Sequence, residues 1–131
     1  MMLTEDIANL LYKECQVFDV PVYRKGNIPK GEVTEDRVVI VPKSQTPSKY
    51  WRKCFVEVNL CTPDIGDGQA NLRRLDELEK AAFDLLDGKA GEYDGYAYKY
   101  SVSSIGIEAD LSMKCHYVNV RILFEILNVM K

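Results

Sequence analysis

The sequence has very little of what most enzyme sites are built from. Among its 131 residues there is a single histidine, His116, and no partner stands at the spacing of a zinc site or an activated nucleophile. The phosphate-binding loop, the dinucleotide motif G-x-G-x-x-G, the nucleophile elbow G-x-S-x-G and the motif H-E-x-x-H are all missing. These absences lead us to expect a protein that is not an enzyme and that uses no cofactor and no metal.

Disulfide-type cysteine patterns, long apolar runs and a strong net charge are missing too. The four cysteines are scattered without a C-x-x-C pair, so we expect free, buried thiols in a reducing compartment. No apolar run approaches the roughly 20 residues that cross a bilayer. The N-terminus carries Glu5 and Asp6 instead of the basic region of a signal peptide. With a mild net charge of -3, we expect a soluble cytoplasmic protein with neither a membrane nor nucleic acid as its partner.

The clearest pattern that is present lies at the C-terminal end, in residues 113–131. The length of 131 residues fits one domain, residues 1–131. Within it, residues 113–131 show the apolar–polar alternation of a long strand with one face in the core of the domain. The apolar run after Ile122 leaves a helical reading open, but the β-branched residues before it favour the strand. The residues on the core face are Val118, Val120, Ile122, Phe124 and Ile126, and those on the opposite face are Tyr117, Asn119, Arg121 and Glu125.

Two amphipathic helices are predicted to cover the sheet. The first starts with Thr4 as its N-cap and ends near Gln16. The second runs from near Gln69 to Asp87, with Gly88 at the position that favours a left-handed backbone. Because both apolar stripes need cover, we expect the second helix to pack on the C-terminal strand. The helix residues of this contact are Leu75, Leu78, Ala82 and Phe83, and the strand residues are Val118, Val120, Ile122 and Phe124.

Shorter strands complete the predicted sheet. In residues 54–61, alternation places Val56, Val58 and Leu60 on one face, and Phe55, Glu57 and Asn59 on the other. The other predicted strands are a weak edge strand at 19–23, a buried strand at 38–41 ended by Pro42, and a strand at 96–102, with 103–112 as its bulged continuation or a connection. This order predicts an α+β domain with an antiparallel or mixed β-sheet and two helices packed on one face.

A basic segment with an aromatic centre, residues 43–53, is the first candidate for a protein-binding surface. It contains Tyr50, Trp51, Arg52 and Lys53, and Trp, Tyr and Arg dominate binding hot spots. The alternative is a surface loop whose Trp51 folds back on the core and whose lysines are only solvated. The same cations would be the contact surface of a nucleic-acid-binding module, a further alternative.

A row of tyrosines is the second candidate. Tyr96, Tyr98 and Tyr100 recur at every second position and share one face of a strand. Large amphipathic rings suit a protein interface, and they equally suit the face of a sheet under a helix, with hydroxyls reaching water. At the level of the sequence both interpretations stay open.

Three acids give the remaining alternative, a small metal-dependent nuclease. Glu57, Asp64 and Asp67 lie around one strand end and the turn after it. Their spacing matches no metal-nuclease motif, and the calcium-loop pattern D-x-D-x-D-G is absent. We therefore expect these acids to serve the turn.

The order of elements resembles the tail-terminator or tail-completion proteins of long-tailed phages and prophages. The resemblance covers nearly the whole chain and rests on an N-terminal helix, the strand VPVY at 20–23, the strand CFVEVNLC, the helix from Gln69 and the closing segment CHYVNVRILFEI. It implies a homo-oligomeric ring, commonly a hexamer, that caps the tail tube and meets the connector proteins at the head–tail junction. No catalytic residue is implied, and the expected location is the host cytoplasm and then the virion.

Overall fold

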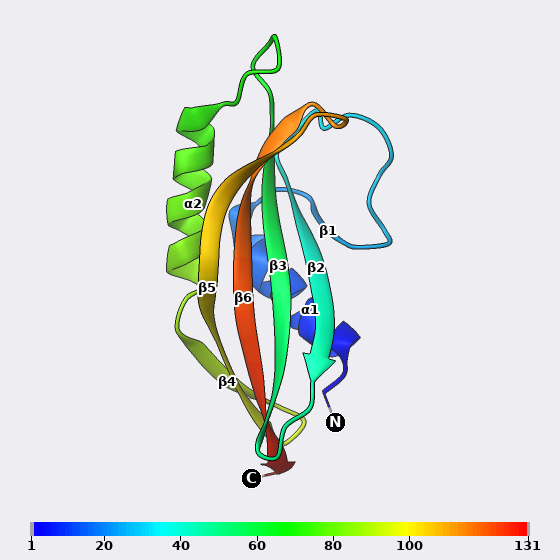
Figure 1. Cartoon of the computed structure of the whole chain (residues 1–131), viewed down its shortest axis with the longest axis vertical. Helices are drawn as coiled ribbons and strands as arrows, with labels where there is room; N and C mark the ends of the chain where they lie inside the picture. The colour runs from blue at the N-terminus through cyan, green and yellow to red at the C-terminus, as the bar shows by residue number, and fades with distance from the viewer. Residues whose placement is uncertain (1, 131) are drawn as a thin grey trace.

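The computed structural model describes residues 2–130, with the side chains of those up to Leu127. Two helices and a six-stranded mixed sheet form an α+β fold in which the helices pack on the sheet, as predicted (Figure 1). The elements are α1 (Thr4–Glu14), the short 3-10 helix η1 (Cys15–Phe18), β1 (Val22–Arg24), β2 (Arg37–Thr46), β3 (Trp51–Pro63), α2 (Leu72–Leu86), β4 (Lys89–Tyr93), β5 (Tyr96–Asp110) and β6 (Cys115–Met130). No helix within residues 2–130 is long and apolar enough to span a membrane.

The sheet has the strand order β1-β2-β3-β6-β5-β4. Among the strands of residues 2–130, β1 and β2 are parallel and the other neighbouring pairs are antiparallel. The central strand β3 pairs with its neighbour β6 along its whole length, from Trp51 opposite Leu127 to Pro63 opposite Cys115. The predicted C-terminal strand is thus confirmed for residues 115–130, whereas Lys131 lies outside the described residues.

The main core lies between the sheet and the helices. In Figure 1, α1 crosses behind the sheet and α2 runs along the β5 side. Leu75, Leu78 and Ala82 of α2 are buried in one cluster with the apolar face of β6, as predicted. The fully buried residues of the central strands are Val56, Val58, Leu60, Val118, Val120, Ile122, Phe124 and Ile126.

Phe83 does not belong to this core, contrary to the prediction. It is 47% exposed, and Leu86 is fully buried in its place. The buried stripe of α2 steps from Leu75 to Leu78, Ala82 and Leu86, at intervals of three and four residues. Phe83 follows Ala82 directly, so the helical rotation of about 100° per residue carries its ring off the stripe.

The helix starts also differ from those predicted. The N-cap of α1 is Leu3, whose backbone N–H donates to Asp6 Oδ2 at 2.7 Å, so Thr4 is the first helical residue. The carboxylate in the first turn satisfies a donor that the helix leaves free. In α2 the cap is Asn71, whose side chain accepts a hydrogen bond from the N–H of Arg74. This helix therefore begins at Leu72, three residues later than predicted.

The sequence predicted that Pro42 ends the second strand, and this prediction is wrong. The strand continues to Thr46 through a bulge between Pro42 and Gln45. Proline lacks the N–H of a central strand, but β1 pairs only with Val38, Val39 and Ile40. Pro42 therefore lies beyond the end of β1, on an edge where no ladder bond is lost.

Residues 89–93 form an edge strand, β4, which is not among the strands predicted from the sequence. The strand pairs with the start of β5 through a tight turn at Asp94 and Gly95, whose φ angles are 48° and 82°. Positive φ at both central residues is the backbone of the two-residue hairpin turn that Asp-Gly favours. Of the two interpretations of residues 103–112, the bulged continuation is correct up to Asp110, with the register shift between Val102 and Ser104.

Candidate interaction surface

One face of the sheet is covered by helices and the opposite face, called the open face here, is not. Successive residues of a strand point to opposite faces, so the odd-numbered residues of β3 and β6 point to the open face. At one end of it Val39, Cys61 and Cys115 are buried in a small cluster with Val33, which precedes β2. Over the rest of the open face the apolar side chains remain partly exposed. They are Val41, Trp51, Phe55, Tyr117 and Leu123.

A polar cluster lies at the middle of the open face. The carboxylate of Glu57 is 3.0 Å from Lys43 Nζ and accepts a hydrogen bond of 3.2 Å from Asn119. The same amide of Asn119 donates to Asn59 at 2.8 Å. Partial burial raises the pKa of Glu57, but the hydrogen bonds from Lys43 and Asn119 and the charges of Lys43 and Arg121 outweigh it, so the pKa lies below its ordinary value.

This lowered pKa predicts how stability changes with pH. A lowered pKa in the folded state contributes stability above the ordinary value of 4.5, and the contribution is lost as the pH falls through the folded pKa. Glu57→Gln should therefore be less stable than the parent at pH 7, with the difference shrinking below about pH 4.5. Urea unfolding between pH 3 and pH 7 measures this. Lys43→Met removes one of the groups that lower the pKa of Glu57, so it should weaken the dependence of stability on pH. If Glu57→Gln lowered the stability equally at all pH values, the lowered pKa of Glu57 would be contradicted.

Cations cover the aromatic rings of the open face. The Arg121 guanidinium lies over Phe55 at 4.0 Å from the ring centroid, and Lys99 Nζ lies over Trp51 at 4.6 Å. Such contacts stabilise exposed sites by about 0.5–1 kcal/mol each. The rings are therefore shielded from water by side chains that a binding partner can displace or pair with.

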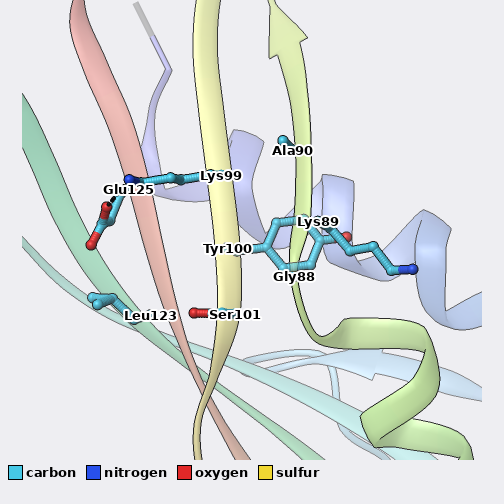
Figure 2. Close-up of a pocket in the computed structure, with 8 residues that line it drawn as sticks. All are labelled: Gly88, Lys89, Ala90, Lys99, Tyr100, Ser101, Leu123 and Glu125. Carbon is cyan, nitrogen blue, oxygen red and sulfur yellow. Dashed lines mark ion pairs between the residues drawn. The ribbon is translucent and has the colours of Figure 1, made fainter.

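A shallow hollow of about 430 Å³ adjoins this region on the side of β4 and β5. Figure 2 shows Lys99 and Glu125 joined across its rim, and the corresponding ion pair measures 3.4 Å. Leu123 and Ser101 also line the hollow, whereas the ring of Tyr100 points away to the other face of the sheet. The hollow is therefore an extension of the open face.

The tyrosine row lies on the helix side of the sheet. It is therefore not an uncovered surface that a partner could bind. Tyr100 is only 4% exposed, and Tyr96 and Tyr98 are partly buried against the same core. Tyr98 and Tyr100 both stack on Phe124, with ring centroids 5.3 Å away. Burial, with the nearby charge of Glu14, raises the pKa of both hydroxyls. The row is mainly core because Tyr98 and Tyr100 are opposite Ile126 and Phe124 of β6.

The basic segment 43–53 is a β-hairpin rather than a loop, and the hairpin separates its candidate residues. Trp51 and Lys53 point to the open face. Arg52 points to the helix side, where it donates to the carbonyl of Met2 at 3.1 Å and to Gln45 at 2.8 Å. Tyr50 stands at the tip, 60% exposed. The four residues therefore do not form one patch, because neighbours on a strand point to opposite faces.

The three acids of the nuclease alternative are not brought together. Glu57 belongs to the cluster on the open face, seven residues along the strand and turn from Asp64, which corresponds to about 23 Å of extended chain. Asp64 instead forms a 2.7 Å contact with Nδ1 of His116. Within residues 2–130 no group of three or more His, Cys, Asp or Glu side chains is placed to hold a metal ion.

All four cysteines are buried, as expected, and unpaired with one another in disulfides. Burial raises the pKa of Cys15 and of Cys61 to about 12. Thiols with such pKa values are protonated at neutral pH and are poor nucleophiles. Cys115 and His116 point to opposite faces, since Cys115 lies in a small cluster with Cys61 away from the helices.

The sequence predicts which residues of each strand point away from the core. It does not show that the outward-pointing residues of two strands form one surface. Phe55, Glu57 and Asn59 were expected on the face opposite the core, as were Asn119 and Arg121. The register joins these two sets, with Glu57 opposite Arg121 and Asn59 opposite Asn119. Only strand pairing shows that they form a single surface.

The architecture is that of an α+β domain with one helix-covered and one open sheet face. No protein-family model matches the sequence, and no characterised protein matches it in sequence. A solved structure of a protein with no descriptive name is similar in fold, with a TM-score of 0.63 and 12% sequence identity. The similarity covers 100% of this chain and 99% of that one, so the whole chain adopts a fold already observed in another protein.

Proposed function

We propose that the protein is a structural subunit of a phage or prophage tail, which assembles into a ring at the head–tail junction. The observation that carries this proposal is the open face. It presents partly exposed aromatic and aliphatic side chains, with Arg121 and Lys99 above two of the rings. Aromatic residues and arginine are enriched in protein interfaces, and apolar groups left in contact with water favour a partner that covers them.

The polar cluster at the centre of this face suits a protein partner that must dock in one orientation. Glu57 and Lys43 form a fixed pair of opposite charges beside the amides of Asn59 and Asn119. Complementary charge and hydrogen bonding across an interface determine register and specificity more than affinity. The apolar side chains around the cluster would supply most of the binding free energy.

The element order gives this surface its biological context. It resembles that of tail-terminator or tail-completion proteins, whose subunits form a ring, commonly a hexamer, on the tail tube. In that setting the partners of the open face are the neighbouring tail proteins. The corresponding location is the host cytoplasm during assembly and the virion afterwards.

The nucleic-acid alternative receives less support from the hairpin. Two of its cations are engaged within the subunit: Lys43 pairs with Glu57, and Arg52 donates to Met2 and Gln45. Binding to the phosphate backbone gains from many cations that face one way. The hairpin separates its remaining lysines between the tip and the open face.

Assembly and binding to tail tubes test the proposal. Light scattering across a range of protein and salt concentrations should give a mass that is a whole multiple of the 14.9 kDa subunit. Negative-stain microscopy should show closed rings. The double variant Phe55→Ser, Leu123→Ser should keep its fold and lose at least about tenfold in affinity for purified tail tubes in co-sedimentation.

A matched control is Val17→Ser, which replaces an exposed apolar residue that does not belong to the open face. Val17 is 73% exposed and lies in η1, outside the strands of the sheet. This variant should bind tubes as the parent does. The proposed function would be refuted if the measured mass stayed at 14.9 kDa at every concentration and the protein did not bind tail tubes.

A further inference from the structure

The tip of the hairpin between β2 and β3 is an exposed aromatic knob that carries a positive charge. Tyr50 is 60% exposed, and Lys49 Nζ lies 5.2 Å from the centroid of its ring. The hydroxyl of Ser48 accepts a 3.0 Å hydrogen bond from the backbone N–H of Trp51, which holds the turn in place. The tip therefore presents a tyrosine and a lysine together on a constrained turn.

A groove of complementary character lies between α2 and β5. It is lined by Glu79, Lys80, Phe83, Asp84 and Ile105 and has a volume of about 340 Å³. Phe83, displaced from the core, and Ile105, partly buried, provide apolar walls.

The rim of this groove carries an available negative charge. Lys80 is 3.4 Å from Asp76 of the same helix, so its charge is already paired. Glu79 and Asp84 form no ion pair with any residue in the described part of the chain. The groove thus offers an apolar interior with two free carboxylates, which suits an aromatic side chain beside a cation.

The strand that borders the groove, β5, has an outer edge that β4 covers only in part. Within residues 2–130, β4 pairs only with the start of β5, so residues 101–110 have β6 on one side and no strand on the other. This segment, SVSSIGIEAD, contains neither proline nor lysine, two residues with which proteins guard an edge against association. The segment does contain a bulge, between Val102 and Ser104, as the opposite edge does between Pro42 and Gln45, and the N–H of Val102 donates to Asp87 Oδ1 at 2.9 Å. The groove therefore lies beside the part of β5 that has no outer strand within residues 2–130.

We infer that the hairpin tip of one copy docks into this groove on the next copy, with Tyr50 against Phe83 and Ile105 and with Lys49 beside Glu79 and Asp84. The inference rests on the proposed function and names the contact between ring subunits. In Figure 1 the hairpin lies at the bottom of the sheet and α2 runs along its left side, so knob and groove are separate surfaces of one subunit. A contact between two different surfaces is head-to-tail, and such contacts form a ring when the rotation closes.

A charge exchange tests the contact on the full-length protein. Lys49→Glu alone, and Glu79→Lys with Asp84→Lys, should each raise the dissociation constant for self-association by at least about tenfold. The triple variant that combines them should recover most of the lost affinity, because the opposite charges meet again. Light scattering over a dilution series measures all three, and circular dichroism checks that each variant is folded.

Two further variants test the apolar part and the specificity of the effect. Tyr50→Ser should weaken self-association as much as Lys49→Glu does. Lys30→Glu, the same charge change in the exposed connection between β1 and β2, should leave self-association unchanged. An assembling protein that is insensitive to Tyr50→Ser and to both charge variants would overturn this inference and leave the proposed function standing. A parent protein that stays monomeric would overturn both.

Discussion

Replacing Phe124 by alanine is expected to lower the free energy of unfolding by about 3 to 5 kcal/mol. Phe124 has no exposed surface and is among the largest fully buried side chains of the described core. Its ring packs beside those of Tyr98 and Tyr100, with a centroid 5.3 Å from each of theirs. The substitution removes the transfer free energy of the ring and leaves a cavity that two tyrosines fixed in β5 cannot close. Urea unfolding followed by circular dichroism measures the change.

The matched control is Phe83→Ala, the same substitution at a ring that is 47% exposed on α2. Because that ring remains largely in water, we expect its loss to cost less than about 1.5 kcal/mol. A cost below about 1 kcal/mol at Phe124 would show that its ring is not a core residue.

The double substitution Tyr98→Ser, Tyr100→Ser is expected to unfold the protein at 25 °C. Large-to-small changes at buried aromatic residues cost about 3 to 5 kcal/mol each, and the whole stability of a domain is about 5–15 kcal/mol. Tyr100 is 4% exposed, and both rings contact Phe124, so the double variant removes most of one aromatic cluster. Circular dichroism in the near ultraviolet and a thermal scan should show no cooperative transition.

Tyr50→Ser serves as the control for this experiment, since it replaces a tyrosine that is 60% exposed. It should retain the thermal transition of the parent. If the double variant instead remained folded and lost only self-association, Tyr98 and Tyr100 would be interface residues. Their placement in the core on the helix side would then be wrong.

Much of the fold could be predicted because strand and helix periodicities are local. Alternation located β3 and β6, and the three-and-four spacing of Leu75, Leu78 and Ala82 located the buried side of α2. Errors occurred where a local signal competes with a tertiary one. Pro42 normally stops a central strand, yet here it lies past the end of β1. The short strand β4 has little periodicity of its own, and pairing with β5 defines it.

The candidate surface could be predicted only in part. Alternation separates the residues of a strand into two faces, but does not say which face a helix covers. For this reason the tyrosine row remained ambiguous until Tyr100 was placed opposite Phe124. The hairpin segment contained residues suited to binding, but Arg52 and Trp51 point to opposite sides of the sheet. The open face required the register of β3 with β6, which joins residues 57 and 59 with residues 121 and 119.

The α+β class, the long central strands, the amphipathic α2 and the burial of the cysteines could all be predicted from the sequence, because each follows from residue type and spacing. Tertiary structure alone decided which sheet face stays open, that Phe83 lies outside the core, and that Glu57, Lys43 and Asn119 meet in one cluster. The physical reason is that a repeat along the chain fixes the direction of a side chain relative to its own strand or helix. What that side chain contacts depends on strand order, register and helix placement, which are set by the packing of the whole chain.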